Sequence, residues 1–190
     1  YTWMKAPRYD GKPMQVGPLS RMLVAYASGH QEVKAQVGEL LGRLGVGPAA
    51  LFSTLGRTGA RGVETVLLAR KLEQWYDQLV SRIRSGDTTT FNRDKWEPSS
   101  WPDTAQGYGY LDAPRGALGH WVKIQNGRIA LYQCIVPSTW NCSPRGGPDD
   151  APGPYEAALM DNHPLVDPNR PIEILRTIHS FDPCMACGVH

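Results

Sequence analysis

The last thirteen residues of the chain hold an unusual density of side chains that bind metals. They contain two cysteines, two histidines and a carboxylate, namely Cys184, Cys187, His179, His190 and Asp182. Cysteines at positions i and i+3 can place both sulfur atoms on one side of a turn. That arrangement suits a single soft metal ion or a metal pair that shares a bridging thiolate. Metal or redox chemistry is therefore the leading hypothesis for this end of the chain.

Two simpler interpretations compete with it. A thioredoxin-like CxxC should follow a strand and open a helix whose amino terminus lowers the thiol pKa, whereas this pair is expected to follow a helix. A structural zinc site needs four ligands, and Cys184, Cys187, His190 and one further residue would supply them. The spacing of the cysteines leaves zinc open as an alternative.

Composition and charge narrow the class of protein. The chain has 190 residues, of which 41% are hydrophobic, so it can build a core without disulfides. Its formal net charge is +2 and the charges are interspersed, which argues against nucleic acid as a partner. The apolar runs are far shorter than the roughly 18 residues that span a bilayer. We expect a soluble or peripheral protein whose residue 1, which is not a methionine, is internal to a longer polypeptide.

Most of the chain before the cysteines has helical periodicity. Helices are expected over residues 19–28, 31–44, 49–55 and 63–84, and shorter ones over 155–160 and from 171 to about 181. The pattern over 63–84 is the strongest and predicts an amphipathic helix of about 33 Å. A helix of that length suits a bundle inside a larger body.

One β element is expected between two loops. Residues 88–112 are polar and interrupted by proline, which predicts a surface loop. In residues 113–136, two segments rich in β-formers flank Asn126-Gly127, a dipeptide that supplies the positive φ angles of a type I′ turn. We therefore predict a mainly α fold, a long-helix bundle with a small β-hairpin. Residues 1–87 would be mostly helical, and residues 137–190 would hold loops, helices and the metal-binding end.

The chain resembles one known family over its whole length. Residues 176–190, RTIHSFDPCMACGVH, resemble the carboxy-terminal signature of nickel-iron hydrogenase large subunits, DPCxxCxxH preceded by HSF. The segments YTWMKAPRY, VGPLSR, KWEP, APRGALGHW and YQCIVPSTWN resemble the same subunit in family order. The resemblance implies that the chain is the carboxy-terminal part of a larger α+β subunit. It also implies reversible oxidation of dihydrogen to protons and electrons, in an enzyme of the membrane-bound uptake type.

The resemblance assigns metal ligands as well. In the family, two amino-terminal and two carboxy-terminal cysteines hold nickel, so Cys184 would be a terminal nickel ligand. Cys187 would bridge to an iron that carries carbon monoxide and cyanide. His190 resembles a ligand of a nearby magnesium ion, and the main-chain carbonyl of Cys134 resembles a second ligand of that ion. Soft thiolates suit nickel, and magnesium prefers oxygen ligands and retains several waters.

Other residues resemble the surroundings of the metal pair. Arg115, which follows Pro114, resembles the arginine that stands over the metals, and Asp182 resembles the carboxylate paired with it. Without the resemblance, Arg115 would be a surface arginine at the mouth of a hairpin. An arginine side chain donates several hydrogen bonds and stays protonated at any working pH.

Pro137 and Ser138 resemble residues that contact a second cyanide, and His179 resembles a histidine beside the cysteine sulfurs. Judged without the family, His179 would be a core histidine and Cys134 a buried strand thiol. Cys142 departs from the family pattern and is expected to be a passive small residue or an oxidation liability.

The family's other signature, RxCGxCxxxH, is absent from the 190 residues. Two thiolates, an acidic magnesium ligand and a glutamate base are therefore expected from the remainder of the large subunit. The resemblance also implies an iron-sulfur small subunit and a membrane cytochrome b as partners. It implies a place at the periplasmic face of the cytoplasmic membrane, with the cytoplasm as the alternative. The rival functions are a zinc-stabilised structural module and a metal-free relative from complex I, although retention of both cysteines argues against the latter.

Overall fold

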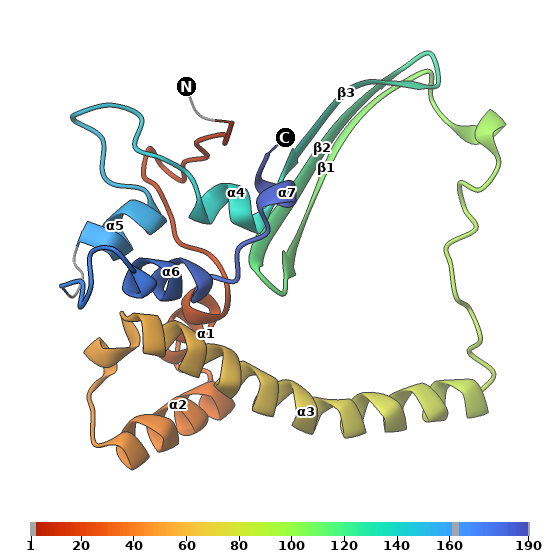
Figure 1. Ribbon diagram of the computed structural model, residues 1–190. Helices are drawn as coiled ribbons and strands as arrows, with labels where there is room; N and C mark the ends of the chain where they lie inside the picture. Colours follow the sequence, from red (N-terminus) through yellow and green to blue (C-terminus); the bar gives the residue numbers. More distant parts are fainter. Residues whose placement is uncertain (1–2, 161–163, 190) are drawn as a thin grey trace.

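The computed structural model of the chain describes residues 3–160 and 164–189. It combines an amino-terminal helical part, a long three-stranded sheet, and short helices that carry the carboxy-terminal residues (Figure 1). The helices are α1 (Pro18–Ala27), α2 (Gln31–Leu44), η1 (Pro48–Leu51), α3 (Thr54–Arg84), η2 (Pro98–Ser100), α4 (Pro137–Asn141), α5 (Pro154–Met160), α6 (Ile172–His179) and α7 (Met185–Gly188). The strands are β1 (Thr104–Ala113), β2 (Gly116–Gln125) and β3 (Arg128–Ile135). This mixture of elements is consistent with a piece of an α+β subunit.

A hydrophobic core holds α1, α2 and the first half of α3 together. Helix α1 begins at Pro18, whose fixed φ suits the first turn of a helix, and α2 ends at Gly45, which adopts a left-handed φ of 65°. Both helices agree with the predicted ranges to within one residue. Removal of aliphatic side chains from water supplies the main force that fixes α1 against α3. The buried core residues are Leu19, Met22, Val33, Val37, Leu41, Leu51, Ala60 and Val63.

Helix α3 starts at Thr54, earlier than the predicted Val63. The short helix predicted over 49–55 is present only in part, because the 3-10 helix η1 ends at Leu51 and residues 52 and 53 separate it from α3. Glycines lower helix propensity, and three of them in this stretch, Gly56, Gly59 and Gly62, obscure the start of α3 in the sequence. These turns of α3 are packed against the rest of the chain: Gly56, Arg57 and Ala60 are buried, and a Cβ on Gly56 would collide with the backbone of Leu51.

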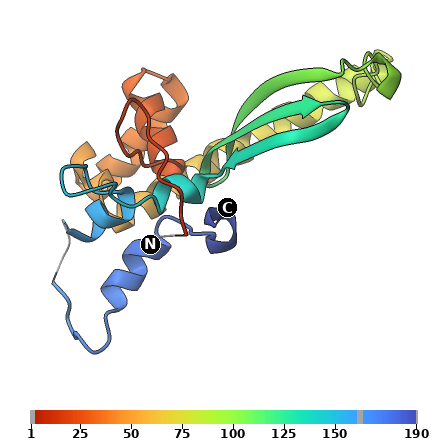
Figure 2. The ribbon, with the colours of Figure 1, turned by 90° about the horizontal axis from the view of Figure 1, so that it is seen from above.

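The second half of α3 has no comparable cover within the described residues. Its apolar side chains are largely exposed, namely Leu68, Leu72, Trp75, Tyr76, Leu79 and Ile83. Seen from above, this half of α3 runs in the same direction as the sheet (Figure 2). The view of Figure 1 shows that the helix and the sheet lie apart. The packing of α3 with other helices is therefore observed over its first half, with α1 and α2.

The sheet has strand order β1-β2-β3 and is antiparallel throughout. The predicted hairpin of β2 and β3 is confirmed, with Asn126 and Gly127 at φ angles of 51° and 68° in its turn. The predicted loop over residues 88–112 is wrong in its last part, because β1 begins at Thr104 and pairs along the length of β2. Strand β1 lacks alternation of buried and exposed residues, so its pairing with β2, rather than its own pattern, defines it.

The carboxy-terminal helices lie beside the base of the sheet. Strand β3 leads into α4, a short helix that the sequence did not predict, and α4 contacts both α7 and β2. The expected helix from 171 to about 181 is present as α6. A single bridge between Met4 and Val189 ties the amino-terminal segment to the end of α7. Among the helices of the described residues, none has the length and apolar character needed to cross a membrane.

Candidate metal centre

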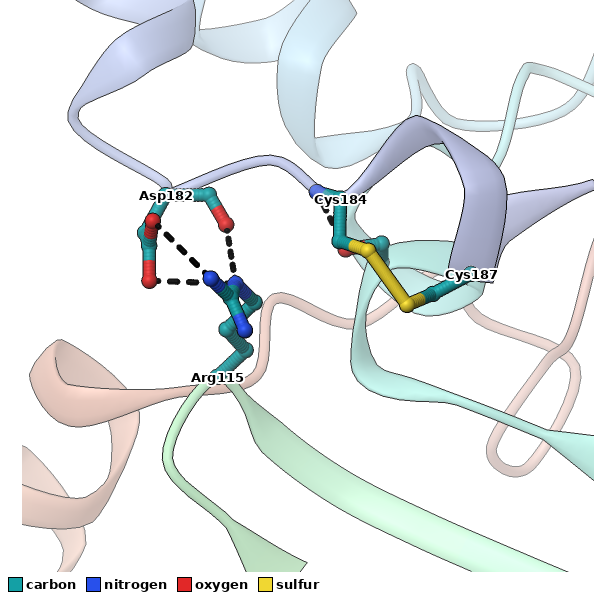
Figure 3. The surroundings of a disulfide bond; sticks show 5 residues. Arg115, Asp182, Cys184 and Cys187 are labelled. Carbon is teal, nitrogen blue, oxygen red and sulfur yellow. Dashed lines mark hydrogen bonds and ion pairs between the residues drawn. A yellow bond between two sulfur atoms is a disulfide. The ribbon is translucent and has the colours of Figure 1, made fainter.

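Arg115 and Asp182 face each other beside the terminal cysteines (Figure 3). The Arg115 Nε donates to the main-chain oxygen of Asp182 at 2.9 Å and lies 3.1 Å from its carboxylate Oδ2. A second guanidinium nitrogen lies 3.5 Å from Oδ1. Both side chains are nearly half exposed, so solvent weakens the ion pair. The pair therefore contributes little to stability, and its main effect is to orient the Arg115 side chain. The pairing expected from the resemblance is thus present in the structure.

Arg115 lies in the tight turn between β1 and β2, directly before Gly116. Gly116 has a φ of 132°, and a Cβ there would meet the side chain of Val16 at 2.5 Å. Gly17 has a φ of 117°, and its own Cβ would lie 2.8 Å from the carbonyl oxygen of Arg115. Two backbones thus cross where only glycines fit. The crossing fixes the direction in which the Arg115 side chain leaves the sheet.

Asp182 and the cysteines follow α6 closely. Asp182 adopts a positive φ of 56° and donates its N–H to the carbonyl of His179, which ends the helix. Pro183 then leads to Cys184, which caps the four-residue helix α7. The CxxC therefore opens a short helix, but the element before it is the helix α6, as expected, rather than the strand of a thioredoxin-like site.

The two cysteines of the CxxC lie side by side. Cys184 and Cys187 have Cα atoms 5.3 Å apart and form a disulfide (Figure 3). Metal binding requires the reduced pair, because the thiolate is the ligand. Once reduced, both sulfur atoms face the same side of α7, which suits one soft metal ion or two that share a sulfur.

Helix α4 supports the cysteines from behind. The buried Ser138 hydroxyl accepts the main-chain N–H of Cys184 at 3.0 Å. Pro137 begins the helix and is also buried. Asn141 at its other end uses its side-chain amide to accept from the N–H of Val16 at 2.9 Å and to donate to its carbonyl at 3.0 Å. Helix α4 therefore contacts both the cysteines and the segment of Val16 and Gly17 that packs on the β1–β2 turn.

Other expected site residues lie further from this group or outside the described range. Cys134 is in β3, where its carbonyl accepts a bond from the Gln133 side chain at 3.3 Å. His179 is exposed at the end of α6, with no contact to the cysteine sulfurs among the interactions described. His190 lies outside the described residues, as does His163. His30, in the helical part, has a structural role, because its side chain accepts from the N–H of Val33 and caps α2.

A buried arginine holds the segment just before Asp182. The guanidinium of Arg57 lies 3.9 Å from the centre of the Phe181 ring and donates to the side chain of Gln15 at 3.2 Å. Burial lowers the pKa of Arg57 to about 10. The ring of Tyr155 packs on Phe181 with centroids 4.7 Å apart. These contacts fix the position of Phe181 and, with it, the start of the metal-binding segment.

The donor set of the described residues fits part of a metal centre and not a complete one. Within residues 3–160 and 164–189, no cluster of three or more cysteine, histidine or acidic side chains has the geometry to hold an ion. The two sulfur atoms fit half of a four-thiolate site for a soft metal, and the remaining ligands must come from other protein. A closed zinc site formed by these described residues alone is not present.

Sequence reasoning missed two residues that organise this region. Arg21, in the VGPLSR segment, binds the turn that carries Arg115, and Asn141, in the YQCIVPSTWN segment, binds Val16. Both lie in segments that carry the resemblance, and that is the signal by which they could have been found. Their partners are remote in sequence, so the contacts themselves were not predictable from local pattern.

Comparisons with known proteins agree over the whole chain. The model of the family described as nickel-dependent hydrogenase matches residues 1–190. The uptake hydrogenase large subunit of Bradyrhizobium diazoefficiens is 53% identical over 190 residues, which are 100% of this chain and 32% of that protein. The Hydrogenase-1 large chain of Escherichia coli is 47% identical with the same coverage. The chain thus spans about a third of the length of these curated relatives.

Solved structures give the same result. The reduced Ni-Fe-Se hydrogenase from D. vulgaris Hildenborough superimposes with a TM-score of 0.77 and 33% identity, covering 100% of this chain and 38% of that chain. An H2-activated [NiFeSe]-hydrogenase from Dm. baculatum has a TM-score of 0.79 and 35% identity, covering 100% and 37%. The fold of these 190 residues therefore occurs within larger hydrogenase chains.

Proposed function

The chain belongs to the nickel-dependent hydrogenase family, and from that premise we propose that it is the carboxy-terminal part of a large subunit that reversibly oxidises dihydrogen to protons and electrons. The observation that carries the proposal is the juxtaposition of a reducible cysteine pair with the Arg115–Asp182 ion pair, in a chain whose whole length matches the family. The chain spans about a third of its relatives, so activity requires the remainder of the subunit.

Cys184 and Cys187 would hold the metals. We assign Cys184 as a terminal nickel ligand and Cys187 as the sulfur shared between nickel and an iron bearing carbon monoxide and cyanide. When bound, this nickel-iron centre supplies the site at which dihydrogen is split unequally. The protein fixes the two sulfur atoms through the short α7 helix and through the bond from the Cys184 N–H to Ser138.

Residues around the cysteines would orient the diatomic ligands and exclude water. The guanidinium of Arg115 has more donors than its contacts with Asp182 use, so it can also donate to a cyanide nitrogen. Pro114, beside it, adds an apolar surface. Ser138 accepts from Cys184, which leaves its own hydroxyl proton free to point toward a second cyanide, with Pro137 adjacent. Asp182 holds the Arg115 side chain in its orientation.

A magnesium ion would stabilise the end of the chain. We propose the imidazole of His190 and the carbonyl of Cys134 as its ligands from this chain. The carbonyl oxygen accepts from the Gln133 side chain at 3.3 Å, so it is within reach of a group that lies outside the β2–β3 ladder. His179 would tune the basicity of the cysteine sulfurs if the complete subunit brings it close to them.

The remaining functions are supplied by partners. The rest of the large subunit would contribute two thiolates, the base that takes the proton, and the helices that cover the exposed second half of α3, completing the long-helix bundle. Electrons would pass to an iron-sulfur small subunit and onward to a membrane cytochrome b. We propose the periplasmic face of the cytoplasmic membrane as its location, with attachment through these partners.

Elemental analysis and infrared spectroscopy of the purified complete assembly test this function. Nickel, together with iron in excess of nickel because the small subunit and the cytochrome also carry iron, is the expected result, with bands from carbon monoxide and cyanide and with hydrogen oxidation. Zinc alone, with no such bands, would establish the structural module instead. Absence of any transition metal would favour the complex-I-like relative.

A further inference from the structure

We propose that Arg21 is a positioning residue for Arg115, because it holds the β1–β2 turn in the orientation that aims Arg115 at Asp182. The proposal rests on the function proposed for Arg115 at the hydrogen-splitting centre. It adds to that function a residue on a different element, α1, which does not itself touch the cysteines in the described contacts.

The guanidinium of Arg21 binds four groups at once. Its Nε and one terminal nitrogen donate to the two carboxylate oxygens of Glu64 in α3, at 2.5 and 2.7 Å. Its other contacts all lie at the β1–β2 turn: the carboxylate of Asp112 at 2.8 Å, and the carbonyls of Ala113 and Pro114, each at 2.9 Å. One side chain therefore connects α1, α3 and the turn.

The network is specific to arginine. A planar guanidinium can fork onto a carboxylate and still donate in other directions, whereas the ammonium of lysine is a point donor. The Arg21 and Glu64 side chains are mostly covered, at 20% and 17% exposure, so the contacts have one geometry rather than several. Burial by itself would lower the pKa of Arg21, but the bonds and charges of Glu64 and Asp112 raise it overall.

The contacts reach Arg115 through its own backbone. The carbonyl of Pro114 belongs to the peptide unit that precedes Arg115, and Arg21 binds its oxygen. The carbonyl of Arg115 belongs to the following peptide unit, and it packs directly on Gly17, the residue that precedes α1. The start of α1 therefore fixes both peptide planes that flank Arg115. Without these contacts, the turn would be free to rotate the guanidinium away from Asp182.

The test uses the complete large subunit in its complex with the small subunit. Arg21→Gln and the milder Glu64→Gln are made alone and in an Arg115→Lys background. Arg8→Gln is the matched control, because Arg8 makes a similar set of bonds to Ser143, Pro144 and Asp150 in another loop. Activity and nickel content are measured for each variant, and the crystallographic Arg115–Asp182 distance is measured for each variant that retains Arg115.

We expect Arg21→Gln to lower hydrogen oxidation by about 100-fold, a loss typical of misplacement by about 1 Å, while nickel is retained. In the Arg115→Lys background the same change should add little, because both changes act on one group. The Nε of Arg115 should move beyond its 2.9 Å contact with the Asp182 oxygen. The losses caused by Arg8→Gln and Arg115→Lys should multiply.

Two outcomes would overturn the proposal: losses from Arg21→Gln and Arg115→Lys that multiply, or an unchanged Arg115–Asp182 contact in the variant. If Arg21→Gln does not fold, Glu64→Gln decides by the same readouts, since it weakens the grip on Arg21 while preserving the shape of the side chain. Failure of the proposed function is separate. It would appear as absent nickel and activity in the unaltered complex, while the crystallographic distance still tests the positioning role.

Discussion

The hydroxyl of Ser138 accepts a hydrogen bond from the main-chain N–H of Cys184 at 3.0 Å, across 46 positions of sequence. Ser138 is 3% exposed, so loss of its oxygen leaves the N–H without a protein acceptor in a poorly hydrated place. We predict that Ser138→Ala destabilises the end of the chain by about 1–3 kcal/mol, the usual penalty for such an orphaned donor. Thermal unfolding of the complete complex, with nickel content recorded, measures this effect.

Thr139→Ala is the control for that prediction. Thr139 is equally buried, but its hydroxyl lacks a hydrogen-bond partner in the described structure, so its removal strands no other group. Nickel should be retained less firmly in Ser138→Ala than in Thr139→Ala. Equal behaviour of the two variants would show that the bond to Cys184 has no structural weight.

Removal of the Cys184 sulfur should abolish nickel retention. Cys184→Ser replaces a soft thiolate by a hard, weakly acidic hydroxyl, which is a poor nickel ligand. Elemental analysis of the purified variant should give less than a tenth of the nickel of the unaltered protein, by an order-of-magnitude estimate from ligand preference. Cys142→Ser is the matched control, because Cys142 is a free thiol outside the pair. A Cys184→Ser variant with full nickel and full activity would refute the ligand assignment.

Arg115→Lys should leave the metal content intact and lower hydrogen oxidation by about 100-fold or more. A lysine retains the charge but cannot bind the carbonyl and the carboxylate of Asp182 together, as the guanidinium does. Arg128→Lys, at the exposed start of β3, is the control and should have near-normal turnover. If the turnover of Arg115→Lys equalled that of the control, the proposed role of Arg115 in the reaction would be wrong.

A methyl group on Gly116, where the β1–β2 turn packs against Val16 and Gly17, should disturb the site although it does not touch the cysteines. Gly116→Ala places a Cβ 2.5 Å from Val16 and 2.6 Å from the Gly17 nitrogen, at a φ of 132°. Backbone strain and overpacking together predict destabilisation of roughly 2–5 kcal/mol, with lower activity because the turn carries Arg115.

The control for this change is Gly127→Ala, in the hairpin turn. That residue also has a positive φ, 68°, but a Cβ there meets nothing within 4 Å. Its predicted cost is only the strain of a left-handed residue, roughly 1–2 kcal/mol. Apparent Tm values for the two variants separate strain from collision. A smaller loss for Gly116→Ala than for Gly127→Ala would contradict the crossing geometry.

Cys142 should react slowly with alkylating agents at neutral pH. Burial raises the pKa of its thiol, and the nearby Tyr155 hydroxyl lowers it by less. Because only the thiolate reacts, a raised pKa reduces the reactive fraction at pH 7 and moves the rise in rate to higher pH. Mass spectrometry of the Cys142 peptide after iodoacetamide treatment, as a function of pH, measures this shift. Unfolded protein is the reference, and a rate at pH 7 that equals the unfolded rate would contradict the prediction.

Local patterns were sufficient for part of this architecture. The ranges of α1, α2 and the β2–β3 hairpin follow from capping glycines, apolar periodicity and the Asn126-Gly127 turn, all of which act over a few residues. The family was recognisable because its motifs are contiguous, above all the CxxC at Cys184 and Cys187. Strand β1 and the start of α3 were not predictable, because their own residues favour neither element.

The candidate site depended on the tertiary structure far more than on any pattern. Arg115 meets Asp182 across 67 positions, and Arg21 meets the turn before Arg115 across 93. Such contacts are decided by how the elements pack, and packing depends on the shapes of many side chains at once rather than on the spacing of neighbours. The residue types that do chemistry are therefore visible in the amino-acid sequence. Their orientation toward one another is determined only when α1, α3 and the sheet pack together.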